Sequence, residues 1–204
     1  MPCGLAKTDL VFILDSSTSV TEENFVRMLQ FCKDIINSAD TDGGSVRVGA
    51  MTFGSVTEVQ FNLNSFSKKH YLFDAIDEMT RVSGNSNVAD AIRAARKRMF
   101  TLENGDRPDA ENVIMLLTDG LSNINSQLTI PEAKFAHLQG IHIYAIGIGL
   151  SDTREIEGIA SEPWQENSFS IRNFEELSDL SESLYMSECQ GKHNVRLTWV
   201  LLNV

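Results

Sequence analysis

Three short segments of the sequence concentrate carboxylate and hydroxyl side chains, and none of them contains histidine or cysteine. Asp15, Ser17 and Ser19 alternate in the first segment, Ser86 lies in the second, and Asp119 lies in the third. Such oxygen donors favour Mg²⁺, Mn²⁺ or Ca²⁺ over Zn²⁺. Mg²⁺ requires an octahedron of ligands and commonly keeps waters or takes an external oxygen. Because only two acids are present, we predict a divalent-cation site whose open position attracts a carboxylate from a partner.

The elements around these segments are expected to bring them together. Continuous apolar runs at residues 10–14 and 112–118 are typical of strands that are covered on both faces. Asp15 and Asp119 each stand at the carboxyl end of such a run. In open α/β sheets, ligands bind beyond the carboxyl ends of the strands. The polar loop at residues 83–87 is therefore expected to meet both acids at one end of the sheet.

The rest of the chain alternates between strand and helix patterns. This alternation predicts an open, doubly wound, mostly parallel α/β sheet with helices on both faces. Gly54-Ser55 precedes an alternating segment, which predicts a tight hairpin and one antiparallel edge strand. Pro131 and Gly140 fit the first turn and the end of one helix. The further expected strands are 46–53, 57–63, 141–148 and 168–171, and the expected helices are 21–36, 68–79, 88–100, 131–139 and 174–187.

Length and charge exclude several classes of protein. The 204 residues can bury the core of one domain, which we place at residues 3–189, and the role of the tail at 190–204 is not predicted. A net charge of −11 argues against nucleic acid and anionic membrane surfaces as partners. No apolar stretch reaches the roughly 20 residues that cross a bilayer. Because no signal peptide precedes the first strand, we expect a mature fragment or an expressed portion of a protein.

The three cysteines comprise one internal and two flanking residues. Cys32 lies in an apolar stripe with helical spacing and is predicted to be a buried free thiol. Cys3 and Cys189 bracket the predicted domain, either as two unrelated thiols or as a bridge between termini that meet. Their position fits the bridge, which would indicate an oxidising compartment and a secreted protein.

Two enzyme classes carry comparable residues directly after their first strand. This sequence lacks a residue or motif that each class requires. Phosphatases of the haloacid dehalogenase type need a second Asp two residues after the nucleophilic one, and here that position is Ser17. Dinucleotide-binding domains need a G-x-G-x-x-G turn, but residues 16–19 are serine and threonine. We therefore predict a binding protein and not an enzyme.

The three segments together resemble the motifs of the von Willebrand factor A family. The sequence D-S-S-T-S at residues 15–19 is similar to the family's D-x-S-x-S signature, which forms its metal-ion-dependent adhesion site, or MIDAS. The sequence T-D-G at 118–120 matches the later motif, whose Asp usually approaches the metal through water. Residues 83–92 are similar to the middle motif G-G-x-T-N-T-x-x-A-[LI], with Ser86 in place of a metal-side Thr. The resemblance covers about residues 3–189.

This resemblance implies a Rossmann-like fold, a Mg²⁺ site in which Mn²⁺ or Ca²⁺ could substitute, and a partner protein with an exposed Asp or Glu. The implied metal-site residues are Asp15, Ser17, Ser19, Ser86 and Asp119. The implied partner-binding residues around the metal are Ser16, Thr18, Gly84, Asn85, Asn87 and Gly120.

The flanking cysteines favour the matrilin and collagen A-domain branch of the family, which implies the disulfide Cys3–Cys189 and an extracellular matrix location. The function implied is adhesion or matrix assembly, with collagen or another matrix protein as the partner. The segment 150–163 leaves little room for the extra helix of collagen-binding integrin domains, so collagen recognition of the integrin type is not expected, and collagen binding by another surface is left open. The alternative is a structural matrix or shell-type component whose metal only stabilises the fold.

Overall fold

The computed structural model describes residues 7–189, with side chains described as far as Leu184. Its centre is a six-stranded sheet in the order β3-β2-β1-β4-β5-β6. All neighbouring strands are parallel except β2 and β3, which form the predicted antiparallel hairpin. The strands are β1 (Thr8–Asp15), β2 (Val46–Phe53), β3 (Thr57–Phe61), β4 (Glu111–Thr118), β5 (Ile141–Ile148) and β6 (Ser168–Ile171).

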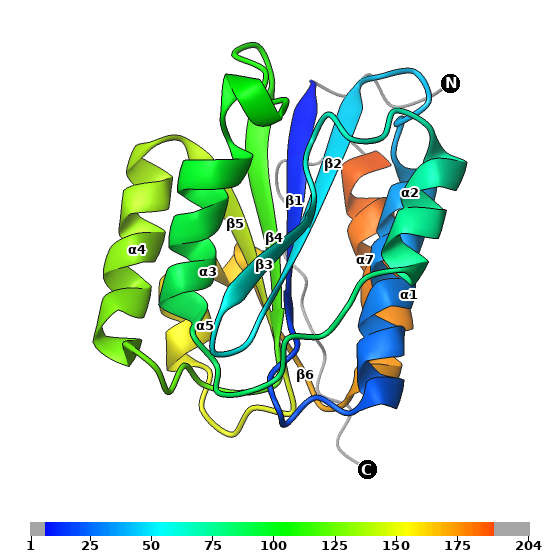
Figure 1. The fold of residues 1–204 in the computed structure, drawn as a ribbon. Helices are drawn as coiled ribbons and strands as arrows, with labels where there is room; N and C mark the ends of the chain where they lie inside the picture. Colours follow the sequence, from blue (N-terminus) through cyan, green and yellow to red (C-terminus); the bar gives the residue numbers. More distant parts are fainter. Residues whose placement is uncertain (1–6, 190–204) are drawn as a thin grey trace.

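Helices cover both faces of the sheet, as Figure 1 shows. One face carries α1 (Glu22–Ser38), α2 (Lys69–Asp77) and α7 (Leu177–Cys189), and the other carries α3 (Val88–Ala94), α4 (Ser126–Leu138) and α5 (Arg154–Ile159). Four short elements complete the chain: η1 (Ala95–Met99), η2 (Leu102–Asn104), α6 (Trp164–Asn167) and η3 (Phe174–Glu176). The predicted doubly wound α/β class is confirmed.

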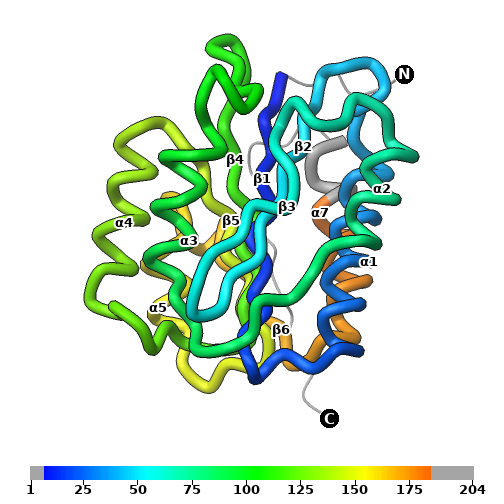
Figure 2. The backbone as a smooth tube through the Cα atoms, in the orientation of Figure 1, coloured from blue at the N-terminus to red at the C-terminus, as the bar shows by residue number. Residues whose placement is uncertain are grey.

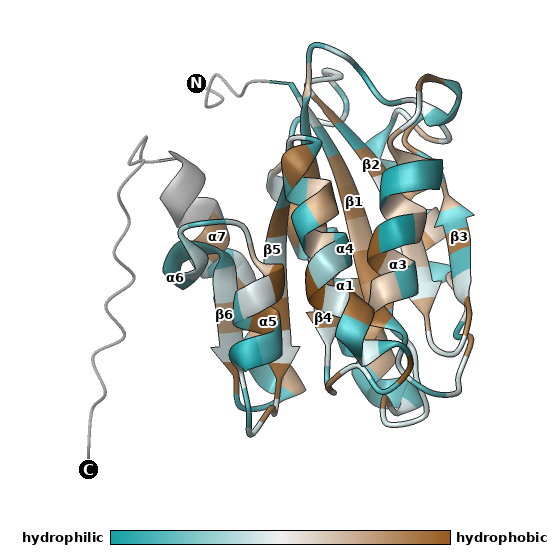
Figure 3. Ribbon diagram, turned by 90° about the vertical axis from the view of Figure 1, so that its left-hand side faces the viewer, coloured by the Kyte–Doolittle hydropathy of each residue, from teal (hydrophilic) through white to brown (hydrophobic). Residues whose placement is uncertain are grey.

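Alternate residues of the central strand belong to two separate cores. Phe12 and Leu14 pack into the core beneath α1 and α7, whereas Val11 and Ile13 pack into the core beneath α3 and α4. Because the middle of β1 is buried on both faces, residues 10–14 are continuously apolar and do not alternate. The apolar bands of the central strands lie between the helical layers in Figure 3. The two cores fix β1 and β4, which carry the candidate site at their carboxyl ends.

A buried ion pair holds the opposite end of β1. The Asp9 side chain is 0% exposed, and its carboxylate accepts hydrogen bonds from both the backbone N–H and the guanidinium of Arg107, at 2.7 and 2.8 Å. The same guanidinium donates to the carbonyls of Gly44, Thr8 and Ser45. One arginine therefore joins the amino-terminal ends of β1, β2 and β4.

Two predicted helices differ from the structure. The helix expected at 131–139 begins at Ser126, so the placement of Pro131 in its first turn was wrong. Tertiary packing explains the longer helix, because Thr129 is buried and the Ile130 side chain packs against Gly158 of α5. The helix expected at 88–100 changes into a π-helical turn, η1. Within the described residues, no helix is long and apolar enough to cross a membrane.

Cys32 is a free thiol in the core beneath α1, as predicted. Its burial raises the pKa of the thiol above the ordinary value, so the group stays protonated and unreactive. The predicted bridge between Cys3 and Cys189 lies outside the described residues, because Cys3 precedes them and the side chain of Cys189 is not among them.

Candidate metal centre

The candidate site lies where the strand order reverses. From β1 the chain continues to β2 on one side of the sheet, and β4 lies on the other side. Such a switch point leaves a crevice outside the carboxyl ends of the two strands. Asp15 ends β1 and Thr118 ends β4, so both of their side chains are placed at this crevice.

Asp15 is the buried anchor of the site. Its Oδ1 accepts the backbone N–H of Ser17 at 2.8 Å, and its Oδ2 accepts the hydroxyl of Thr118 at 2.6 Å. Burial raises the pKa of the Asp15 carboxyl, although the hydrogen bonds from Ser17 and Thr118 oppose this shift. The nearby Asp119 carboxylate raises the pKa further. A cation placed here would compensate a buried negative charge.

Two serines connect this anchor to the second acid. The hydroxyl oxygens of Ser17 and Ser19 lie 3.1 Å apart, and the Ser19 hydroxyl donates to Asp119 Oδ1 at 2.7 Å. Asp119 follows β4, whereas both serines follow β1. The structure thus brings the first and third sequence segments into direct contact, as predicted.

The middle segment is held against the first by reciprocal hydrogen bonds. Thr18 donates its backbone N–H to the Gly84 carbonyl at 2.9 Å, and the Gly84 N–H donates to the Thr18 hydroxyl at 3.1 Å. Figure 2 shows the two loops side by side below the sheet. Gly84 has a positive φ of 91°, and a Cβ there would collide with the Ser55 side chain, so glycine is required. This close approach carries Ser86 to the crevice.

The buried hydroxyl of Ser86 indicates whether a cation fits the candidate metal centre. Its hydroxyl oxygen is buried and has no hydrogen-bond partner among the residues that the structure describes. A buried polar atom without a partner costs about 1–3 kcal/mol, so it calls for an explanation. Coordination of this oxygen to a metal ion is such an explanation. The donor set of two carboxylates and three hydroxyls therefore fits a hard divalent cation.

The hydroxyls are necessary to this site, because acids alone do not complete it. Within residues 7–189, no three His, Cys, Asp or Glu side chains gather in a way that could hold a metal ion. Asp15 and Asp119 are the two acids at the crevice, and Ser17, Ser19 and Ser86 supply the further oxygens. Few protein ligands leave room in an octahedral shell for water or an external oxygen.

The predicted partner-binding residues surround this cluster at different depths. Thr18 and Asn85 are exposed, and Gly84 and Gly120 are partly exposed. Ser16 and Asn87 are buried. Ser16 donates to the Phe53 carbonyl, and Asn87 accepts the Asp90 N–H as the N-cap of α3, so both hold the loops in place. The exposed residues remain available to a partner.

Sequence reasoning missed two residues that support these loops. Glu155 in the first turn of α5 accepts the backbone N–H of Ser122 at 2.8 Å. Arg81 donates to the carbonyls of Ser17 and Val20. Both partners are backbone groups, which no sequence motif reveals. The signal for Glu155 in the sequence is its position beyond the carboxyl end of the fifth strand, at the end of the sheet where ligands bind.

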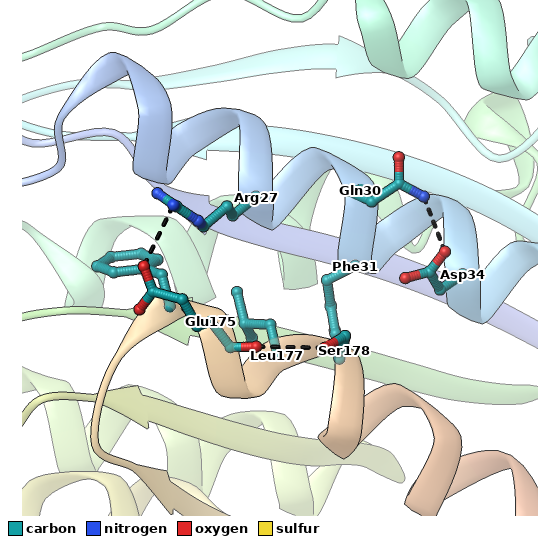
Figure 4. Close-up of a pocket in the computed structure, with 8 residues that line it drawn as sticks. Arg27, Gln30, Phe31, Asp34, Glu175, Leu177 and Ser178 are labelled. Carbon is teal, nitrogen blue, oxygen red and sulfur yellow. Dashed lines mark hydrogen bonds and ion pairs between the residues drawn. The ribbon is translucent and has the colours of Figure 1, made fainter.

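A pocket with a volume of about 260 Å³ lies between α1 and the η3–α7 segment, apart from the metal centre. Figure 4 shows that its polar residues pair with one another. Arg27 forms an ion pair with Glu175 at 3.2 Å, Gln30 donates to Asp34, and the Ser178 hydroxyl donates to the Glu175 carbonyl. The Arg27–Glu175 pair joins α1 to η3, the other two pairs lie within their own segments, and none of them points to a ligand.

A doubly wound sheet with two acids and three hydroxyls at its switch point defines a class of metal-binding α/β domain. The chain belongs to the von Willebrand factor type A domain family, whose family model matches residues 9–183. It is 33% identical to matrilin-2 of Mus musculus over 92% of its length and 31% identical to matrilin-3 of Gallus gallus over 92%. It is also 30% identical to integrin alpha-X of Mus musculus over 89% of its length.

The chain spans only part of each of these relatives: 20% of matrilin-2, 41% of matrilin-3 and 16% of integrin alpha-X. Among solved structures, it is similar to proximal thread matrix protein 1 from the mussel byssus, with a TM-score of 0.84 and 27% identity over 90% of this chain and 48% of that one. A further structure of that protein has a zinc-occupied MIDAS motif, with a TM-score of 0.83 and 26% identity. A structural neighbour of this chain therefore holds a metal ion at its MIDAS motif.

Ser86 yields a prediction that separates metal binding from folding. In EDTA, Ser86→Ala should raise the free energy of unfolding by about 1 kcal/mol, because it removes an unpartnered buried hydroxyl. The same change should weaken Mg²⁺ binding by about tenfold or more, because a ligand is lost. Urea unfolding and calorimetric titration measure the two effects. Ser86→Thr, which keeps the hydroxyl, is the control and should retain affinity; equal Mg²⁺ affinity in Ser86→Ala would exclude the hydroxyl as a ligand.

Proposed function

We propose that this domain is a metal-dependent protein-binding module that holds Mg²⁺ at its MIDAS-type site and captures an Asp or Glu side chain of a partner. The observation that carries this proposal is the hydrogen-bonded cluster of Asp15, Ser17, Ser19 and Asp119. Ser86 is hydrogen-bonded through its carbonyl to the loop that carries Asp119, and its buried hydroxyl has no partner among the described residues. The bound metal would supply an open coordination position that attracts an external carboxylate.

The chain's own residues would hold the metal and shape the approach to it. Asp15, Ser17, Ser19 and Ser86 would bind or closely approach the metal, and Asp119 would act mainly through water. The two carboxylates would neutralise the charge of a divalent cation and add no excess negative charge. Burial makes the negative charge of Asp15 costly when no cation is bound. A metal ion whose shell of protein ligands is incomplete then favours binding of an oxygen atom from a partner.

The loops that form the crevice are almost free of charged side chains, although Arg81 and Glu155 hold them from outside. Among residues 16–20, 54–56, 83–87 and 119–125, Asp119 is the one charged side chain. Val56 is 56% exposed and Leu121 is 43% exposed in these same loops. An incoming carboxylate would therefore meet little repulsion despite the net charge of −11. Neighbouring apolar groups of the partner could contact Val56 and Leu121.

The relatives support a matrix setting for this activity. They include matrilins, the alpha-6 chain of collagen VI, an integrin and a thread matrix protein. The proposed partner is accordingly a matrix protein, collagen included, with an exposed Asp or Glu. We place the protein outside the cell, with the domain extending over residues 3–189 and closed by Cys3–Cys189. No catalytic role is proposed, because Ser17 stands where an acid–base partner of Asp15 would be needed.

The second candidate function is structural. The metal would stabilise the domain within a matrix material, and it would take no direct part in binding a partner. The buried Asp15 carboxyl favours this reading, because a cation that neutralises it would also stabilise the fold. Similarity to a thread matrix protein is consistent with it. The two functions predict different effects of metal removal on partner binding.

Metal removal is expected to abolish partner binding. The measurement is the binding of the purified domain to immobilised matrix proteins, collagen VI among them, in Mg²⁺ and in EDTA. The proposed function predicts binding in Mg²⁺ and none in EDTA, with Asp15→Asn inactive in both. If EDTA lowers only the melting temperature and leaves binding intact, the structural function is the correct one.

A further inference from the structure

The loop that carries Asp119 is anchored at two points. It runs from the end of β4 to the start of α4, over residues 119–125. On one side, the Ser86 carbonyl accepts the N–H groups of Asn123 and Ile124, at 3.0 and 3.1 Å. On the other side, the Glu155 carboxylate accepts the Ser122 N–H at 2.8 Å. The first anchor is part of the middle loop, whereas the second comes from a helix outside all three motif segments.

The Glu155 anchor is built on a rigid support. Its neighbour Ile156 and the later Ile159 are buried in the core beneath α4 and α5, which fixes the first turn of α5. Burial raises the pKa of the Glu155 carboxyl, so its partial enclosure has an energetic cost that the hydrogen bond from Ser122 offsets. Ser122 is itself buried, and its hydroxyl donates to the Ile124 carbonyl within the loop.

A purely local role for Glu155 does not account for this contact. An acid in the first turn of a helix is stabilised by the helix dipole without any partner. Glu157, in the same short helix, fills such a local role, because it accepts the Thr153 hydroxyl at 2.6 Å. Glu155 instead reaches a backbone group that lies 33 residues away along the chain.

We propose that Glu155 is a positioning residue for the metal centre, which acts by holding the Asp119 loop through the Ser122 N–H. Only two residues separate Asp119 from Ser122, so a shift at Ser122 is passed directly to the Asp119 carboxylate. It is passed also to Ser86, whose carbonyl binds the next two N–H groups of the loop. Groups that orient metal ligands commonly change metal affinity by about 10- to 100-fold when they are removed. The inference rests on the proposed metal site.

Two conservative substitutions separate hydrogen bonding from charge. Glu155→Gln removes the charge but keeps an oxygen that can accept the Ser122 N–H. Glu155→Asp keeps the charge but withdraws the acceptor by one methylene. If Glu155 acts by holding the Ser122 N–H in place, Mg²⁺ affinity measured by calorimetry should fall about 10- to 100-fold in Glu155→Asp. The affinity of Glu155→Gln should stay near that of the wild type. Glu157→Ala is the matched control in the same helix and should keep wild-type affinity.

The opposite pattern would overturn the inference. If Glu155→Gln loses affinity and Glu155→Asp retains it, the carboxylate acts through its charge. If both variants bind Mg²⁺ like the wild type, Glu155 has no role at the metal. Melting temperatures in EDTA verify that each variant is folded. Failure of the wild type itself to bind Mg²⁺ would refute the proposed function, which is a distinct outcome from unchanged affinity in the variants.

Discussion

Replacing Arg107 by alanine is expected to lower the free energy of unfolding by about 3–5 kcal/mol, because it leaves a buried carboxylate without its partner. Asp9 is fully buried, and the Arg107 side chain is 11% exposed. The guanidinium also donates to the carbonyls of Gly44, Thr8 and Ser45, and all three would lose this hydrogen bond. These groups lie at the amino-terminal ends of β1 and β2, and Arg107 itself precedes β4, so the loss affects the centre of the sheet.

Urea unfolding in EDTA measures this effect without any contribution from metal binding. Arg98→Ala is the matched control, because Arg98 is an exposed arginine, and its stability should stay within about 0.5 kcal/mol of wild type. Mg²⁺ affinity of folded Arg107→Ala should be unchanged, since Arg107 binds at the end of β1 opposite to Asp15. A loss of less than about 1 kcal/mol would show that the ion pair is not a main support of the sheet.

Replacing Asp15 by asparagine is expected to weaken Mg²⁺ binding by more than about 100-fold. The change removes one of the two negative charges at the crevice, and it preserves the size of the side chain. Asparagine can still accept the Ser17 N–H, so the loop geometry should persist. Because burial makes the Asp15 charge costly, the metal-free variant should be at least as stable as the wild type.

Calorimetric titration of Mg²⁺, with melting temperatures in EDTA, checks both parts of this prediction. Asp90→Asn serves as the control, since Asp90 lies in the first turn of α3 and outside the cluster. Wild-type affinity in Asp15→Asn would exclude Asp15 from the metal centre. A variant that loses Mg²⁺ binding only because it unfolds would be recognised by its lowered melting temperature.

Much of the fold could be predicted because burial leaves a clear pattern. Strands β2, β5 and β6 have the predicted bounds, since each is a run of β-forming residues between turn signals. The start of α4 could not be predicted, because packing against α5 outweighs the local signal of Pro131. The π-helical turn after α3 could not be predicted either, because helical spacing alone does not distinguish it from a continued α-helix.

The site could be predicted as far as its side chains form motifs. The contacts between Ser17, Ser19 and Asp119 follow from placing each motif at a strand end. The unpartnered state of Ser86 could not be predicted, because it depends on every neighbouring donor and acceptor. Glu155 was missed for a related reason: its partner is a backbone N–H, which is the same in every residue type except proline.

Crystals of the domain soaked in Mn²⁺ and measured at the manganese absorption edge would locate the metal centre. A metal held by these loops should give one strong anomalous peak in the crevice between β1 and β4, within coordination distance of the Ser17, Ser19 and Ser86 hydroxyls. The peak should vanish in Asp15→Asn crystals. A strong peak elsewhere, or none in this crevice at saturating Mn²⁺, would contradict the assignment of the metal centre.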